Sequence, residues 1–335
     1  MRALSVRIAP GWILLALFIG SCSLQPPSAT PSLLSPAAPS VAPSLFPDTP
    51  TPTPLLVLVG EADEALVQAL TQWSSQRGWG LTSYPDETTS PERLALPQGV
   101  RALVSMTGLE IASLTSTRPD MIAVVVDQET MTSGPRVSTV GMPGARRDQA
   151  GFLAGVLAGL VDGAETLRVV SGTGGEWDGV YLAAFDHGVR YSCPKCAVTE
   201  LQAEALASSA MGQRTEVLFV IPGPAAAETA NEAIALGARW LIWVGEGSEG
   251  TDPSRVAGQV MFVREELVVQ ALEALLNGEA GTPWPYTVEN SGIRLADIHP
   301  EAISPGRLRW AEEAYDQLAS GDLDPGVDPL TGAGP

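Results

Sequence analysis

The chain has 335 residues, 45% of them apolar, and its 38 acidic and 19 basic side chains give a net charge of −19. Binding of nucleic-acid phosphates needs a basic surface, so this charge excludes a nucleic-acid partner. Lys195 is the only lysine, and His187 and His299 are the only histidines. A Walker-type phosphate loop is therefore excluded, sites with several histidine ligands are almost excluded, and we expect neither metal nor cofactor.

Residues 1–21 have the pattern of a bacterial lipoprotein signal peptide. Arg2 and Arg7 precede an apolar run at 11–19, which is too short to cross a hydrocarbon core of ~30 Å as a helix. The run ends in an Ile-Gly-Ser-Cys sequence that resembles a lipobox, in which Cys22 is lipidated and becomes the mature N-terminus. The alternatives are an ordinary secretory signal with an incidental cysteine and an uncleaved anchor. We predict a lipid anchor on the extracytoplasmic side of the cell membrane.

Residues 22–54 combine the lipidated cysteine with a linker. Positions 23–54 contain ten Pro, six Ser and four Thr, and Asp48 is their only charge. Such a composition cannot bury enough apolar surface to fold, and its prolines favour an extended polyproline II conformation. We therefore predict a disordered tether between the anchor and a folded head.

Ten apolar runs from residue 55 onward have the length and composition of β-strands. Several are continuously apolar, such as Ile122-Ala123-Val124-Val125-Val126, which is typical of parallel strands covered on both faces by helices. The expected strands are residues 55–60, 80–84, 100–106, 121–127, 137–141, 167–171, 198–203, 216–221, 240–245 and 257–263.

Segments with helical patterns alternate with these strands. They cover residues 63–77, 147–160, 178–191, 226–236, 265–277 and 305–320. Repeated strand–helix–strand units predict an α/β fold of doubly wound, mostly parallel sheets. Ten strands are too many for one open sheet of ordinary size, so two lobes are expected, with ligands at the carboxyl ends of the strands.

The expected lobe boundaries follow from the order of these elements. The first lobe is expected to contain residues 55–165 and 258–290. The second lobe is expected to contain residues 166–257 and 291–325. Residues 326–335 are expected to form a flexible tail.

Three consecutive motifs resemble the basic-membrane-protein (Bmp/PnrA-like) family of ABC-transporter substrate-binding lipoproteins. The helix Asp148-Gln149-Ala150-Gly151-Phe152-Leu153-Ala154-Gly155 is similar to the family's "sYLAGxxAgL" helix. It is followed by a strand and a glycine pair, and then by Phe185-Asp186-His187-Gly188-Val189 in place of the family's "F-x-x-G-[FV]". The closing Gly292-Ile293-Arg294-Leu295 and Ile303-Ser304-Pro305 resemble the family's C-terminal segment.

The resemblance implies a type I periplasmic-binding-protein fold, whose two lobes close on a ligand held in the cleft between them. Known members bind nucleosides and deliver them to an ABC-type permease, and some relatives act in regulation. The partners expected for this chain are thus a nucleoside or another small polar solute, permease subunits, and the membrane through the lipid anchor.

The resemblance also suggests ligand-binding residues. Aligning the acid pair of the family's "DDkSFN" motif with Asp63 and Glu64 places Val67 at the aromatic position and Gln68 at the amide position. An amide and two acids are kept, whereas the stacking ring is lost. Glu246 stands where the family has an aspartate near the ribose hydroxyls, and carboxylates can accept hydrogen bonds from vicinal diols.

Four further positions complete the candidate site, each with a structural alternative. Asp127 ends a strand and either faces the cleft or caps a turn. Gly174 and Trp177 lie at a strand-to-helix turn whose backbone amides face the cleft, so the indole either stacks on a ligand or covers the rim. Arg264 replaces a basic residue of the family after the hinge or is a solvated helix start. Trp243, inside a strand, is assigned to the core.

Cys193 and Cys196 enclose a Pro-Lys pair. In an exported protein this spacing most simply forms a disulfide. A metal knuckle would need a second cysteine pair, and a thioredoxin-like role would place the first cysteine at the start of a helix, whereas here it follows one.

We predict that the protein is not an enzyme, because no nucleophile motif, dinucleotide fingerprint or histidine triad is present. The predicted function is solute binding for an ABC-type importer. The alternative is a sensor or interaction protein of the same fold with a degenerate ligand site.

Overall fold

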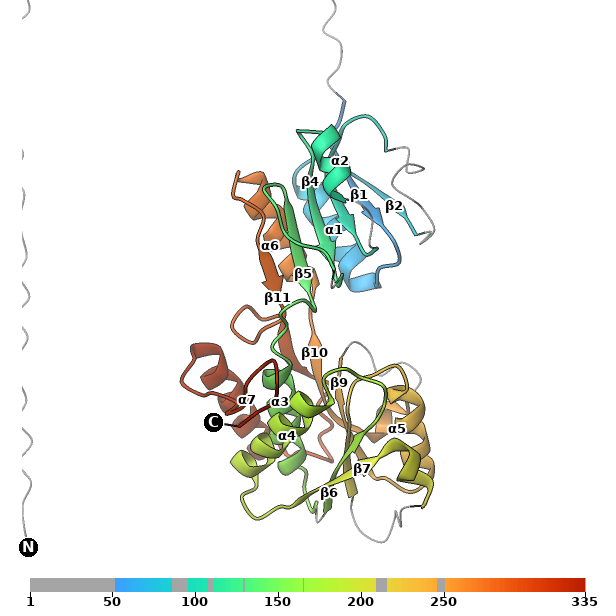
Figure 1. Cartoon of the computed structure of the whole chain (residues 1–335), viewed down its shortest axis with the longest axis vertical. Helices are drawn as coiled ribbons and strands as arrows, with labels where there is room; N and C mark the ends of the chain where they lie inside the picture. The colour runs from blue at the N-terminus through green and yellow to red at the C-terminus, as the bar shows by residue number, and fades with distance from the viewer. Residues whose placement is uncertain are drawn as a thin grey trace, which may run out of the picture. The chain divides into compact units, whose positions relative to one another are not determined.

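The computed structural model describes residues 52–85, 96–107, 111–128, 130–164, 166–208, 216–245 and 251–334 (Figure 1). The predicted signal peptide, Cys22 and most of the linker lie outside these residues. Within the described ranges, no helix is both long enough and apolar enough to cross a lipid bilayer.

The first lobe is a parallel sheet covered on both faces. Alternating residues of β1, such as Leu56 and Val57, belong to separate apolar clusters on opposite faces of the sheet. The helices α1 (Glu64–Gln76) and α6 (Glu265–Leu276) cover one face, and α2 (Ile111–Thr117) covers the other. The described strands, in the spatial order β11-β5-β4-β3-β1-β2, are β11 (Pro283–Pro285), β5 (Val137–Gly141), β4 (Ile122–Val126), β3 (Val100–Ser105), β1 (Leu55–Val59) and β2 (Gly80–Tyr84).

The second lobe repeats this plan, with one antiparallel strand at its edge. α3 (Arg147–Gly159), α4 (Asp178–Ser192) and α7 (Pro305–Ser320) pack on one face. α5 (Ala226–Ala235) and the 3₁₀ helix η1 (Ala203–Ser208) pack on the other (Figure 1). The described strands, in the spatial order β12-β10-β9-β8-β6-β7, are β12 (Ile293–Ala296), β10 (Val256–Phe262), β9 (Trp240–Val244), β8 (Glu216–Val220), β6 (Thr166–Ser171) and β7 (Val198–Gln202).

The predicted architecture is confirmed: the chain forms two lobes, each a doubly wound, mostly parallel α/β sheet with helices on both faces. The first five strands of each sheet follow the order 2-1-3-4-5, in which ligands bind outside the carboxyl ends of the strands. The described chain passes between the sheets at residues 142–146, 263–264 and 286–292.

The lobe boundaries differ from the expected ones in two places. β10 pairs with β9 and β12, so it belongs to the second sheet and not to the first lobe. α3 packs mainly on α4 and also belongs to the second lobe. The composition of these segments suits either lobe, because a buried parallel strand or a small-residue helix looks the same in both.

The short edge strands β11 and β12 were not expected from the sequence. β11 is Pro-Trp-Pro, and proline is accepted only at the edge of a sheet because it cannot donate to the ladder. Neither segment is long enough to show a periodic pattern.

Glycines bring α3 and α4 into backbone contact. A Cβ atom at Gly155 would lie 2.1 Å from the carbonyl oxygen of Phe185, and one at Gly188 would lie 2.0 Å from that of Phe152. Real Cβ atoms cannot approach so closely, so both positions need glycine. The small-residue spacing of the predicted helix therefore reflects close packing on α4.

Candidate functional site

Asp63 and Arg264 meet at the carboxyl edge of the first sheet. Asp63 follows β1 and caps α1, because its Oδ1 accepts a hydrogen bond from the Leu66 amide at 2.7 Å. Its Oδ2 accepts from Arg264 Nε at 3.0 Å and lies 2.8 Å from Arg264 Nη2. Arg264 stands directly before α6, where the chain has just left the second sheet. The ion pair thus ties this crossing to the first lobe.

Asp127 joins the same cluster from the end of β4. Its Oδ1 accepts from the Met142 amide at 3.1 Å, and its Oδ2 accepts from Arg264 Nη1 at 3.2 Å and from the Tyr286 hydroxyl at 3.1 Å. A Cβ at Gly141 would lie 2.0 Å from Asp127 Oδ1, so only glycine leaves room for this carboxylate. Met142 and Tyr286 begin two of the crossings between the sheets, so the cluster touches all three.

The cluster remains accessible to solvent on its acidic side. The side chains of Asp63 and Asp127 are 41% and 24% exposed, whereas that of Arg264 is 10% exposed. Burial raises the pKa of Asp127, and the Arg264 guanidinium and three hydrogen bonds oppose this rise. With two carboxylates against one guanidinium, the ionised group carries a net negative charge. Each carboxylate oxygen can accept more than one hydrogen bond, so the group can still bind hydroxyl donors.

The carboxyl edge of the second sheet presents a glycine-rich turn and Trp177. Gly172 and Gly174 have positive φ and are exposed, and the Gly172 amide donates to Asp178 Oδ2 at 2.8 Å. Trp177 is half-buried directly before α4, and the guanidinium carbon of Arg147 lies 4.2 Å from its ring centroid. Since Arg147 is buried, this cation–π contact orients the indole strongly.

The structure brings some predicted residues together and leaves others apart. Asp63, Asp127 and Arg264 form one cluster, while Gly174 and Trp177 share the turn of the second lobe.

The other predicted residues lie outside these two groups. Gln68 is exposed on α1, one turn beyond the cap. Glu246 lies outside the described residues. Trp243 is 8% exposed and packs in the core of the second lobe.

Tyr286 and Arg147 are missing from the sequence-based site. Tyr286 is 1% exposed and stacks on Phe262 at 5.2 Å between centroids, so it looks like a core residue apart from its hydroxyl. Arg147 is the first residue of α3, where an arginine is ordinarily solvated. Neither residue lies in a motif that could have revealed its partner.

Cys193 and Cys196 form a disulfide at the end of α4. Their Cα atoms are 5.4 Å apart. The bond lies on an outer turn, away from the residues of the candidate site. Among the described residues, no group of three His, Cys, Asp or Glu side chains is arranged to hold a metal ion.

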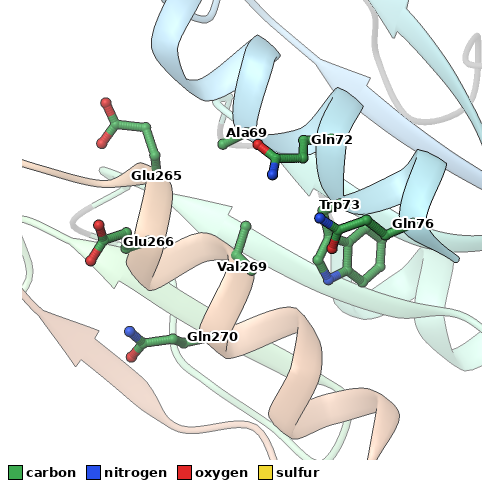
Figure 2. A pocket seen from close by; sticks show the side chains of 8 residues that line it. All are labelled: Ala69, Gln72, Trp73, Gln76, Glu265, Glu266, Val269 and Gln270. Carbon is green, nitrogen blue, oxygen red and sulfur yellow. The ribbon is translucent and has the colours of Figure 1, made fainter.

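A groove of about 340 Å³ runs between α1 and α6 on the helical face of the first lobe (Figure 2). Its lining includes Trp73, Val269 and the amides of Gln72, Gln76 and Gln270. No residue of the candidate site lines this groove. We therefore assign the site to the carboxyl edges of the sheets, where charged groups converge.

No protein-family model and no curated protein matches this sequence. Among solved structures, the fold is similar to an ABC transporter system solute-binding protein from Conexibacter woesei DSM 14684, with a TM-score of 0.57 and 16% identity over 82% of this chain and 98% of that chain. An ABC transporter system solute-binding protein from Aeropyrum pernix K1 has a TM-score of 0.53 and 14% identity over 82% of this chain and 93% of that chain. A transcriptional activator of the comK gene from Bacillus halodurans has a TM-score of 0.58 and 14% identity over 81% of this chain and 99% of that chain. At these identities the similarity shows the fold alone, and it confirms the predicted two-lobed, periplasmic-binding-protein-like α/β fold.

Proposed function

We propose that this protein is a lipid-anchored, extracytoplasmic solute-binding protein of an ABC-type importer, which closes its two lobes around a small, neutral, polyhydroxylated ligand such as a nucleoside. The observation that carries this proposal is the accessible cluster of Asp63, Asp127 and Arg264, placed where all three crossings meet. A ligand bound there would contact the residues that move when lobes hinge.

The chemistry of the cluster favours a neutral ligand over an anionic one. Two carboxylates accept hydrogen bonds from vicinal hydroxyls, and their net negative charge repels phosphates and carboxylates. Trp177 offers an indole from the opposite lobe that can stack on a base or a sugar face. The kinship with Bmp/PnrA-like proteins, the anchor at Cys22 and the contribution of Glu246 are part of this proposal.

A non-transport role of the same fold is the second candidate. It is favoured by Val67, which leaves the first lobe without the expected stacking ring, and by the carboxylate oxygens of Asp63 and Asp127, each of which already has a partner within the chain. In that case the cluster would hold the hinge without binding a solute.

We expect ribose and nucleosides to raise the melting temperature of the full chain. Ribose 5-phosphate and nucleoside monophosphates should not raise it, because the negative cluster repels their phosphate. Only the phosphate distinguishes the members of each pair. Asp127→Asn should then weaken binding of the stabilising compound by roughly tenfold to a hundredfold, the effect of losing a charged hydrogen-bond acceptor. Calorimetric titration measures this change.

Asp186→Asn is the matched control, because Asp186 pairs with Arg190 on α4, outside the candidate site. It should leave the affinity unchanged. Absence of stabilisation by any nucleoside or neutral sugar at millimolar concentration would rule out the proposed ligand class and favour the non-transport role.

A further inference from the structure

The chain continues beyond α7 as an extended segment packed on the second lobe. Gly321, with a φ of 76°, ends α7 in the left-handed conformation. Leu323, Pro325 and Val327 then point inward: Pro325 and Val327 are buried, and Leu323 packs against the core cluster. The intervening acids at 322, 324 and 328 are exposed. This period of two is typical of an extended chain with one buried face. Residues 326–334 therefore differ from the flexible tail that we expected.

Two contacts fix this segment along α4. The carbonyl oxygen of Pro325 lies 3.0 Å from His187 Nδ1, in the middle of the helix. Because a carbonyl can only accept, the histidine donates this hydrogen bond. At the other end, a Cβ at Gly332 would lie 2.7 Å from the carbonyl oxygen of Gly179, so glycine is needed for the close approach. Gly179 is the second residue of α4, two positions after Trp177.

A compact turn holds the end that reaches Gly179. The amides of Asp328 and Gly332 donate to the carbonyls of Ala333 and Asp328, both at 2.8 Å. The Asp328 carboxylate accepts from the amides of Leu330 and Thr331 at 3.0 and 2.8 Å. Because these hydrogen bonds lie within the turn itself, the turn is an ordered local structure.

An acid of the same segment also acts on the first crossing. The carboxylates of Asp148, Glu289 and Asp324 raise the pKa of Arg146, and the largest cause is the hydrogen bond that Arg146 donates to Asp148. Arg146 is the last residue before α3. The charge of Asp324 therefore adds to the negative potential around this crossing.

We infer that residues 321–334 form a strap that positions the Gly172–Trp177 turn, and hence the ligand-facing surface of the second lobe. Val327 anchors the strap in the core, and Gly332 seats its turn on Gly179 at the first turn of α4. The effect on ligand affinity rests on the proposed function, whereas the positioning of the turn does not.

Hydrogen–deuterium exchange of the full chain and of four variants tests this inference. In Val327→Asp and in a chain ended after Asp322, exchange in residues 172–182 should rise at least threefold, while exchange in β4 of the first lobe stays unchanged. Val327→Ile should keep residues 172–182 as protected as in the parent chain, because it leaves an apolar anchor of similar size. Leu330→Ser is the surface control, since Leu330 is 71% exposed, and it should have no effect.

Two results would overturn the strap. One is unchanged exchange in residues 172–182 when the segment is absent. The other is a rise that is equal in β4, which would indicate general loosening. If exchange rises only near Trp177 and no nucleoside or sugar binds the parent chain, the strap stands and the proposed ligand class fails.

Discussion

Gly188→Ala should lower the free energy of unfolding by about 3 kcal/mol, a loss expected where a new atom is forced into a closely packed interior. The added Cβ would lie 2.0 Å from the carbonyl oxygen of Phe152 and 2.9 Å from the backbone nitrogen of Val156. Both atoms belong to the backbone of α3, so no side-chain rotation relieves the clash. α4 would have to move away from α3, which would expose Phe185 and its stacked partner Phe219.

Gly179→Ala is the matched control in the same helix. A Cβ at Gly179 meets no atom within 4 Å, so the change adds helix propensity without a clash and should be neutral or stabilising by up to about 1 kcal/mol. Urea unfolding followed by circular dichroism measures both variants. Equal stabilities for the two alanine variants would show that α3 and α4 are not in backbone contact.

Arg264→Met should have the second large effect, a loss of about 2 kcal/mol at pH 7. Removing one partner of a fully buried ion pair costs about 3–5 kcal/mol. The partial exposure of Asp63 and Asp127 reduces that figure through solvent screening. Methionine keeps most of the buried side-chain volume, so the loss reports the charge. Arg101→Met is the surface control, because the Arg101–Asp120 pair is 49% and 81% exposed.

The loss should depend on pH in a definite direction. Burial raises the pKa of Asp127 and Arg264 opposes the rise, so the variant raises this pKa further. The folded variant then binds a proton more readily than the unfolded chain, and stability increases as the pH falls. The deficit should be largest at pH 7 and shrink toward pH 4. A deficit that stays constant over this interval would contradict the assignment of Arg264 as the counter-ion of Asp127.

The sequence predicts the parts of the fold that depend on local pattern. The continuous apolar run of β4 forms a buried strand, and the acid at position 63 begins a helix, because burial and capping act within a few residues. The lobe to which β10 belongs depends on its neighbours, β9 and β12, which no local pattern reveals.

The candidate site shows the same limit. Asp63, Asp127 and Arg264 can each be selected by position and by resemblance, yet their mutual ion pairs join residues up to 201 positions apart. Tyr286 belongs to the cluster through its hydroxyl alone. The strap shows an alternating pattern over only a few residues, too short to predict its packing. Interactions between distant segments therefore account for what sequence reasoning missed.

The distance between spin labels on the two lobes tests the central claim most directly. Glu64 and Glu228 are exposed in the first turns of α1 and α5, next to the carboxyl ends of β1 and β8. Labels attached at both positions through an unnatural ketone side chain leave the cysteines unmodified. If the protein is a hinged solute-binding protein, the nucleoside or sugar that stabilises it should shorten this distance, and Asp127→Asn should shift the response to higher concentration. An unchanged distance at saturating ligand would contradict the account.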